Sequence, residues 1–397
     1  MLNLAKWYLI SKMQTKKVYF SGFPYHTYVK IVLANPPAGY EFIVQNPEKD
    51  NNLLTNLKKN KLFIFAYHNV IKRLFNVFSL LNRFYNKKSP DNIDLIFGRL
   101  TFENKPLVME ILDSPFSMSG HDYDVFVKNL PKLKIGLESN YCKKIIVHTE
   151  DCKKLFERYF SKKVIDKITV LSPAINSIKL NKRNYNHKEF TMLFMGSINN
   201  PEDFYIKGGN LVLETFSILS KKFPQARLIM KCKTPIESKN KYKSDKIKFI
   251  ESNLSEEQVE ELYMKSDILF MPGDLYFLMA FLEALAHGLP IVALNNYGTS
   301  DFILNGKNGF TIKPSSKVPY NSPAYPSSIV REGAFLKDSL NPDLEVAKTL
   351  ADKISLLINN PKILKKMSQK SLQLSKTKFS LDSRVKELKD IFDEALK

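Results

Sequence analysis

A lysine between a strand end and a glycine pair is the first group with an evident chemistry. Gly196-Ser197 follow a predicted strand, and Lys207-Gly208-Gly209 lead into a predicted helix, with residues 199–206 predicted to lengthen the loop between them. A fixed ammonium beside a helix N-terminus stabilises the negative charge of a phosphate group. We therefore expect Gly196, Ser197 and Lys207 to bind phosphate, with Lys207 also stabilising a phosphate group that departs. The alternative is an ordinary solvated loop lysine.

A carboxylate inside the next predicted strand–helix unit is the second such group. Glu283 follows a buried strand at 267–272 and lies in a helix that begins near Leu278. Carboxylate oxygens there can accept hydrogen bonds from a pair of neighbouring hydroxyl groups, such as those of a ribose. The alternative is a surface glutamate without a ligand. The apolar residues of this helix recur at helical spacing; they are Leu278, Phe281, Leu282, Leu285 and Ala286.

The elements that must position Glu283 form one continuous run, residues 266–312. Gly288 stands where a left-handed residue is expected to end the helix, and residues 290–294 are the next strand. Gly298 opens a short helix that Gly306 closes, and residues 309–312 are a further strand. Parallel strands joined by right-handed helical crossovers bind ligands at the strand carboxyl ends. We therefore expect a ligand site at the ends of these strands.

The whole chain alternates strands and helices, which predicts doubly wound α/β domains. Its 397 residues are too many for one core, so we expect two domains, 1–180 and 188–379, and a last helix at 380–397. Residues 313–342 are predicted to be an inserted loop, and 344–397 to be helical. The predicted strands of the first domain are 17–22, 41–45, 62–67, 93–97, 107–112, 144–148 and 168–171, and its helices are 28–34, 136–141 and 150–160. The second domain has strands at 191–195, 226–232 and 247–251, a helix at 209–223 and a capping box at 255–258.

Composition narrows the class of protein. Apolar residues make up 44% of the chain, which favours ordered globular structure. Three scattered cysteines, Cys142, Cys152 and Cys232, do not form a disulfide framework or a zinc motif, so we expect a reducing, cytoplasmic location. Residues 1–9 carry Lys6 within an apolar run and do not resemble a signal peptide. The chain has no run of about twenty apolar residues that would span a membrane.

The formal net charge of +20 predicts an anionic partner. Residues 1–180 hold 28 Lys and Arg against 15 Asp and Glu, so the excess is greatest there. Lipid headgroups, nucleic acid and an anionic glycan all fit, and a lysine-rich genome is the alternative. Residues 72–88 are basic and aromatic, with an apolar stripe at helical spacing. We interpret them as a possible contact with the anionic inner face of a membrane, or as an ordinary helix packed on a sheet.

Three stretches resemble a known family. Residues 281–293, followed by Gly298-Thr299-Ser300-Asp301 and residues 305–310, resemble the donor-binding core of retaining GT-B glycosyltransferases, and glycosyltransferase family four in particular. The resemblance implies an α/β GT-B fold, with two Rossmann-like doubly wound domains facing each other across a cleft. It also implies an acceptor-side first domain, a nucleotide-sugar-binding second domain, and a C-terminal helix at 380–397 that crosses back to the first.

The resemblance assigns roles to residues of the second domain. It implies that Glu283 binds the ribose, that Lys207 binds the pyrophosphate, and that the backbone near Asn253 and Leu254 holds the base. The family has a second carboxylate eight residues before Glu283, which binds the donor sugar. This chain has Leu275 there, and Asp274, one residue away, could substitute for it. Phe277, Leu278 and Met279 are further donor-binding positions, because the family favours glycines here whose backbone amides reach the phosphate. The hydroxyl of Thr299 is another, although it could instead cap the following helix.

Three residues of the first domain are further candidates. Gly22, at the end of the first strand, would let a phosphate approach the backbone, unless it is only a turn glycine. Family members place a histidine near the reacting sugar, which makes His121 and Asp113 candidate catalytic residues, with a surface loop as the alternative. Residues 122–124 match a two-carboxylate metal motif of the GT-A fold, but three residues are a weak match. We expect neither a metal nor any other cofactor.

The resemblance implies a metal-independent glycosyltransferase of hexosyltransferase type. It would transfer a sugar from a nucleoside diphosphate sugar to an acceptor hydroxyl with retention, on a glycan or lipid-linked acceptor of the cell envelope. Leu275 and the missing glycines motivate an alternative, a degenerate GT-B protein that binds a nucleotide or a partner without turnover. A nucleic-acid-binding protein is motivated by charge alone, and we do not expect nucleic acid as a partner.

Overall fold

The structure is a computed structural model, and the chain forms two compact units. Unit 1 comprises Met1–His148, Cys152–Leu171 and Val385–Lys397, and unit 2 comprises Thr149–Asp151 and Ser172–Arg384. The structure describes residues 15–22, 26–44, 93–97, 105–121, 123–178, 183, 185, 188–196, 201–273, 277–315 and 340–397. The strand predicted at 62–67, the segment 72–88 and most of the predicted insertion lie outside the described residues.

Unit 1 is built on a parallel sheet with the order β2-β1-β3-β4-β5-β6. β1 pairs with both β2 and β3, so the strand order reverses between β1 and β3. All pairs are parallel, which puts every strand's carboxyl end on the same edge. The strands are β1 (Lys16–Ser21), β2 (Tyr40–Val44), β3 (Ile93–Phe97), β4 (Leu107–Ile111), β5 (Cys142–Val147) and β6 (Ile168–Val170).

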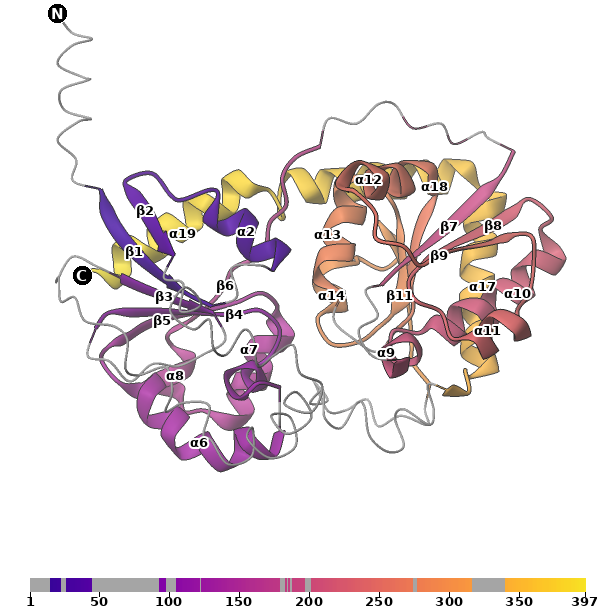
Figure 1. The fold of residues 1–397 in the computed structure, drawn as a ribbon. Helices are drawn as coiled ribbons and strands as arrows, with labels where there is room; N and C mark the ends of the chain where they lie inside the picture. The colour runs from indigo at the N-terminus through magenta and orange to yellow at the C-terminus, as the bar shows by residue number, and fades with distance from the viewer. Residues whose placement is uncertain are drawn as a thin grey trace, which may run out of the picture. The chain divides into compact units, whose positions relative to one another are not determined.

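Helices cover both faces of this sheet (Figure 1). α2 and α19 lie on one face, and α6, α7 and α8 on the other. The ring of Phe392 in α19 lies 5.2 Å from that of Tyr40, whose hydroxyl donates to Asp393 Oδ1 at 2.7 Å. These contacts attach the C-terminal helix to the edge of the sheet. The helices are α2 (Thr27–Leu33), α6 (Tyr123–Glu138), α7 (Glu150–Tyr159), α8 (Lys162–Ile165) and α19 (Leu381–Ala395).

The helix predicted at 136–141 is wrong in its bounds. α6 begins at Tyr123 and ends at Glu138, with Pro131 in its interior. Burial of Phe126, Leu133 and Leu137 on one face compensates for the backbone hydrogen bond that the proline removes. The short helix η3 (Pro115–Ser119), which ends at the left-handed Gly120, lies between Asp113 and His121, the two residues for which a surface loop was the alternative.

Unit 2 has a second parallel sheet with the order β12-β11-β10-β7-β8-β9. β7 pairs with β8 on one side and with β10 on the other, so this sheet reverses between β7 and β10. The predicted α/β class, with two doubly wound units, is confirmed. The strands are β7 (Phe190–Met195), β8 (Ala226–Lys231), β9 (Ile247–Ile250), β10 (Ile268–Met271), β11 (Ile291–Leu294) and β12 (Gly309–Ile312).

The helices of unit 2 also divide between two faces, with α12 and α13 on one and α10, α11 and α17 on the other (Figure 1). The predicted capping box is present, since Ser255 Oγ accepts from the Gln258 amide and Gln258 Oε1 accepts from the Ser255 amide. The left-handed Gly288, with a φ of 68°, ends α13 as predicted. The helices are α9 (Pro201–Ile206), α10 (Gly209–Lys222), α11 (Ile236–Lys241), α12 (Glu256–Lys265), α13 (Leu278–Ala286), α14 (Thr299–Phe302), α17 (Leu344–Asn359) and α18 (Pro361–Lys376).

Two predictions about loops in unit 2 are wrong. Residues 199–206 were predicted to lengthen the loop before Lys207, but α9 takes up Pro201–Ile206 and packs the Phe204 ring inside the unit. α14 ends at Phe302 and not at Gly306. Gly306 instead lies in the turn before β12, with a φ of 76°.

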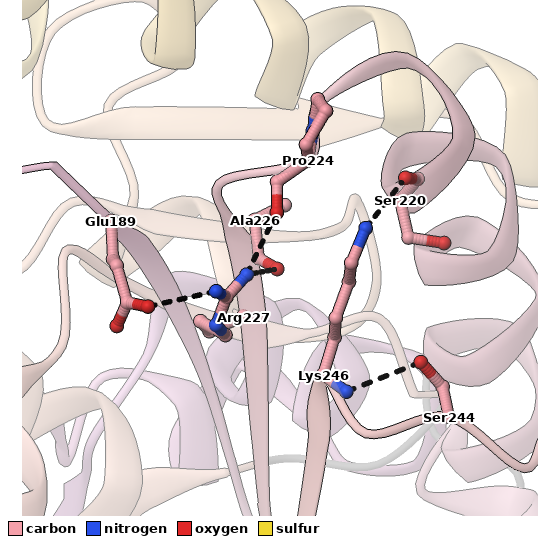
Figure 2. A network of polar contacts seen from close by, with 7 residues as sticks. All are labelled: Glu189, Ser220, Pro224, Ala226, Arg227, Ser244 and Lys246. Carbon is pink, nitrogen blue, oxygen red and sulfur yellow. Dashed lines mark hydrogen bonds and ion pairs between the residues drawn. The ribbon is translucent and has the colours of Figure 1, made fainter.

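The amino ends of β7, β8 and β9 are fixed by polar contacts, shown in Figure 2. Arg227 Nη2 pairs with Glu189 at 2.8 Å, and its Nη1 donates to the carbonyls of Pro224 and Ala226. Lys246 Nζ donates to the Ser220 carbonyl near the end of α10. The polar side chains at the amino edge of the sheet therefore bind one another and the backbone. The carboxyl edge is the edge at which we look for a ligand site.

All three cysteines are buried and free of disulfides. Among the helices that the structure describes, none combines the length and apolar character needed to cross a bilayer.

Candidate functional site

The carboxyl edge of unit 2 brings two loops together where the strand order reverses. Gly196 follows β7, and its amide donates to the Lys231 carbonyl at the end of β8. Pro272 and Gly273 follow β10, the other neighbour of β7. Open α/β sheets bind ligands at such a switch point. Ser197 and Asp274, two predicted donor-binding residues in these loops, lie outside the described residues, as does Leu275.

The backbone at Lys207 is packed directly against the loop after β10. A Cβ atom added at Gly208 would lie 2.7 Å from the Pro272 carbonyl oxygen, and one added at Gly273 would lie 2.3 Å from the Lys207 carbonyl oxygen. A Cβ at Gly209 would lie 2.4 Å from the Phe204 ring. Gly208 also has a φ of 85°, which disfavours other residues. Glycines at these positions therefore fix the Lys207 backbone at the switch point.

Lys207 stands immediately before the N-terminus of a 14-residue helix, α10. Gly208 is the N-cap and offers no side-chain acceptor to the first-turn amides. Burial raises the pKa of Cys232, the residue after β8, to about 11, and the nearby charge of Lys207 acts in the opposite direction. A lysine and a helix N-terminus together can hold an anion such as a diphosphate.

Glu283 belongs to a bonded group on the α12–α13 face of unit 2. Its Oε2 accepts the Tyr263 hydroxyl at 2.7 Å, and its carbonyl oxygen lies 2.7 Å from His287 Nδ1. The rings of Tyr263 and His287 stack with centroids 4.9 Å apart. Burial raises the pKa of Glu283, and the Tyr263 hydrogen bond opposes this shift. Tyr263 is fully buried while Glu283 is only partly buried, so the carboxylate is held at the margin of the core.

Arg183 holds the helix ends beneath this group. Its guanidinium donates to the carbonyls of His287 at 2.9 Å, Ser266 at 2.6 Å and Tyr263 at 2.5 Å. These carbonyls lie at the ends of α12 and α13, where a cation is favourable. Burial lowers the pKa of Arg183 from its ordinary value, and the guanidinium stays charged. Arg183 therefore fixes the two helices that carry Tyr263 and Glu283.

The predicted base-binding loop follows β9. Asn253 is exposed and Leu254 partly buried. Just before them, Glu251 Oε1 accepts from the Thr234 amide at 2.9 Å and pairs with Lys239 at 2.7 Å. The hydrogen bond from Lys239 lowers the pKa of Glu251. These contacts join the carboxyl ends of β8 and β9. They fix the position at which the loop after β9 begins.

Four predicted donor-binding residues have little or no exposed side chain. Phe277 and Leu278 are buried, with the Phe277 ring 5.8 Å from Phe281, and Met279 is partly buried. Phe277 and Leu278 can therefore meet a ligand mainly through their backbone. Thr299 is buried in the first turn of α14, and Gly298 with its left-handed φ of 72° is the N-cap. The alternative expectation that Thr299 caps this helix is wrong.

In unit 1 the structure brings Asp113 and His121 together. His121 Nδ1 lies 3.2 Å from Asp113 Oδ2, and Asp113 Oδ1 accepts the Ser114 amide at 2.6 Å. His121 has a φ of 62°, which is uncommon for a residue other than glycine. Both residues follow β4 on the carboxyl edge and are partly exposed. Gly22 follows β1 at the switch point of this sheet, where a Cβ would lie 2.9 Å from Phe97 Cβ.

A buried group near the same edge was missed by the sequence analysis. Glu110 Oε1 accepts the Tyr28 hydroxyl at 2.8 Å and lies 2.7 Å from His148 Nε2, with the Glu110 and His148 side chains fully buried. The Tyr28 and His148 rings meet edge to face at 4.9 Å. An acidic residue inside the apolar strand Leu107–Ile111 was the signal in the sequence. Tyr263 and Arg183 carried no such signal.

Asp124, from the weak metal motif, is exposed in the first turn of α6, and Asp122 lies outside the described residues. Within the part of the chain that the structure describes, no three His, Cys, Asp or Glu side chains gather as metal ligands would.

Comparisons with known proteins agree with this architecture. Residues 189–320 match the family described as Glycosyl transferases group 1. An uncharacterized glycosyltransferase of Haemophilus influenzae is 25% identical over 258 residues, which cover 63% of this chain and 61% of that relative. The chain thus spans about three fifths of the length of this curated relative.

Three solved structures share the fold. Sucrose-phosphate synthase from Thermosynechococcus elongatus has a TM-score of 0.57 at 13% identity, covering 96% of this chain and 98% of that one. Anabaena Alr3699/HepE in complex with UDP and glucose has a TM-score of 0.55 at 13% identity, with coverages of 96% and 99%. The pneumococcal O-GlcNAc transferase GtfA in complex with UDP and GlcNAc has a TM-score of 0.53 at 15% identity, with coverages of 77% and 57%. The chain therefore has the two-unit GT-B fold, and its residues 189–320 match the Glycosyl transferases group 1 family.

Proposed function

We propose that the protein is a glycosyltransferase that uses a nucleoside diphosphate sugar as donor. The observation that carries this proposal is the packing of Lys207 and Gly208 against Pro272 and Gly273, at the switch point of unit 2. It fixes the backbone of Lys207 and the amino end of α10 at the place where open α/β sheets bind ligands. The match of residues 189–320 to Glycosyl transferases group 1 supports the same activity.

In this proposal unit 2 holds the donor. Lys207 and the first turn of α10 bind the diphosphate and stabilise the charge that builds on it as the sugar–oxygen bond breaks. Glu283 accepts hydrogen bonds from the ribose, while Tyr263 fixes its other oxygen. Asn253 and Leu254 lie beside the base. Two of the three solved structures described above contain UDP, so uracil is the base to test first.

The finer assignments extend the proposal. Transfer proceeds with retention, by front-face attack in which the departing phosphate helps to take the acceptor's proton, as the resemblance to family four implies. The protein acts as a hexosyltransferase and requires neither a metal nor another cofactor. Asp113 and His121, whose side chains lie 3.2 Å apart, act on the acceptor side. The acceptor is a glycan or lipid of the cell envelope at the cytoplasmic face of the membrane, with residues 72–88 as one membrane contact.

A degenerate protein that binds nucleotide without turnover is the second candidate. It is favoured by the burial of Phe277 and Leu278, where family members have glycines. Donor hydrolysis distinguishes the two candidates. Release of nucleoside diphosphate from a donor panel, with or without acceptor, supports the transferase. Nucleotide binding with no release from any donor supports the second candidate.

The donor site is tested by thermal unfolding with UDP, other nucleoside diphosphates and their sugars, with and without EDTA. A ligand that binds the folded state raises the midpoint by mass action. We expect UDP to stabilise the protein equally in EDTA, and Lys207→Ala to abolish most of the shift and lower turnover about 10²–10³-fold. The matched control is Lys265→Ala, which removes an exposed lysine paired with Glu261. No shift with any nucleotide, or equal loss in both variants, contradicts the proposal.

A further inference from the structure

α6 has one face packed into unit 1. Phe126 meets the rings of Phe116 at 4.9 Å and Tyr159 at 5.2 Å, both nearly edge to face. Lys167 Nζ donates to the carbonyls of Leu137 and Ser139, which fixes the C-terminal end of the helix. The orientation of α6 is therefore set, and its opposite face points away from the core.

That opposite face carries an apolar stripe. Val127, Pro131 and Ile135 follow one another at spacings of four residues, which puts them in line along a helix. Val127 is 44% exposed and Ile135 is 70% exposed. Isolated apolar residues on a surface are ordinary, but aliphatic side chains aligned on the outer face of one helix form a directional surface.

Lysines border the stripe on both sides. At about 100° per residue, Lys128 and Lys132 lie on one side of it and Lys134 on the other. All three are exposed, and among the described residues none of them forms an ion pair. The acidic residues of this face stand at its two ends: Asp124 is exposed in the first turn, and Glu138 accepts the Ser161 hydroxyl at 2.6 Å in the last.

A second basic group lies next to the C-terminal end of α6. The Ser161–Glu138 hydrogen bond puts the start of α8 beside the last turn of α6. The following Lys162 and Lys163 are both exposed. The positive charge around the stripe is therefore extended by a neighbouring helix.

We propose that this face of α6, formed by Val127, Lys128, Pro131, Lys132, Lys134 and Ile135, binds the surface of an anionic lipid bilayer. Ile135 and Val127 enter the boundary between headgroups and acyl chains, and the lysines pair with headgroup phosphates, as in other interfacial helices. Nucleic acid offers the same phosphates but no apolar layer for Ile135. A stripe of three apolar side chains on one helix is also small for a protein interface. The inference does not depend on the donor chemistry of unit 2.

Flotation of the full chain with vesicles tests the proposal. We expect binding to vesicles of phosphatidylglycerol and phosphatidylcholine, weak binding to phosphatidylcholine alone, and loss of binding as salt is raised. Lys128→Ser, Lys132→Ser and Lys134→Ser should each weaken binding about fivefold, in line with the electrostatic contribution of one lysine near such a surface. Val127→Ser with Ile135→Ser should weaken it at least as much. Ile236→Ser is the matched control, because Ile236 is 62% exposed on α11 of unit 2.

A fluorescence measurement separates insertion from simple adsorption. The chain has one tryptophan, Trp7, so Trp7→Phe combined with Ile135→Trp reports on position 135 alone. We expect a blue shift of its emission with the anionic vesicles. Absence of that shift overturns the proposal, as does binding that is equal in the wild type and both sets of α6 variants, since the membrane contact would then lie elsewhere. Stabilisation by UDP in the same samples reports separately on the donor site.

Discussion

Each unit holds a tyrosine, a glutamate and a histidine in one bonded group, and the two groups differ in what surrounds the carboxylate. In unit 1, Tyr28 and His148 both meet Glu110 Oε1, at 2.8 and 2.7 Å, inside the core. In unit 2, Tyr263 meets Glu283 Oε2 at 2.7 Å, while the histidine, His287, contacts the backbone carbonyl of Glu283. Glu110 lies on a central strand and Glu283 on a helix.

This difference separates a structural carboxylate from one that can bind a ligand. Glu110 and His148 are fully buried and 2.7 Å apart, so their contact pairs two polar side chains within the core of unit 1. Glu283 is only partly buried and receives no side-chain hydrogen bond from His287. The Tyr263 hydroxyl donates to Oε2 of Glu283, and the carboxylate lies at the margin of the core. The same residue types therefore serve different purposes because of the element that carries them.

The largest expected effect of a substitution is at Glu110. Glu110→Ala leaves the Tyr28 hydroxyl and His148 without their carboxylate inside a dry core. A buried polar group that loses its hydrogen-bond partner typically costs about 1–3 kcal/mol, and two groups lose that partner here, so the expected loss is about 2–6 kcal/mol. We expect that loss in the free energy of unfolding of unit 1, measured by urea denaturation.

The matched substitution in unit 2 should affect function and not stability. We expect Glu283→Gln to lower kcat/KM for the donor roughly 10- to 150-fold, the equivalent of about 1.5–3 kcal/mol for hydrogen bonds to a charged group. Burial raises the pKa of Glu283, so the folded state disfavours its ionised form, and the stability of the protein falls as pH rises from 4.5 to that raised pKa. At neutral pH, Gln should therefore leave the unfolding midpoint unchanged or higher. Equal losses of stability in the two variants would erase the distinction between the groups.

The amino-acid sequence predicts the strands and helices of unit 2 better than it predicts the contacts of the candidate ligand site. The run 266–312 alternates so regularly that β10, α13, β11 and β12 follow from spacing and glycines alone. Pro131 shows the limit of such local patterns, because burial of Phe126 and Leu133 keeps α6 helical across it. Tertiary packing determines the secondary structure of such segments, and a short stretch of sequence does not reveal that packing.

The site depends on contacts between residues that are distant in the chain. The spacing around Lys207 predicts a phosphate site, and this stays a prediction, but nothing in the sequence places Gly208 against Pro272. Tyr28, Glu110 and His148 are separated by 82 and 38 residues, so only the fold brings them together. Phe277 and Leu278 look available in the sequence and prove to be buried.

The tyrosines allow a smaller and better matched comparison. Tyr263→Phe removes the hydrogen bond that opposes the upward pKa shift of Glu283, so we expect the acid limb of the donor kcat/KM profile to move to higher pH. Tyr28→Phe removes the corresponding bond to Glu110 and should cost about 1–3 kcal/mol of stability, with the pH profile unchanged. A profile that shifts in both variants, or in neither, would show that Tyr263 has no special relation to the donor site.

The smallest expected effect concerns His287. Burial lowers its pKa below the ordinary 6.5, and among the described residues its Nε2 has no hydrogen-bond partner. The unfolded chain therefore takes up a proton near pH 6.5 while the folded protein resists it, and stability is lost as pH falls from 6.5 toward the lowered pKa. His287→Phe keeps a ring against Tyr263 but cannot titrate. We expect the difference in unfolding free energy between the two proteins to be constant above pH 7 and to move in favour of the variant below 6.5. A difference that stays flat down to pH 5 would mean that His287 accepts a proton in the folded state as easily as in the unfolded chain, and that its stacked position in unit 2 does not isolate it from water.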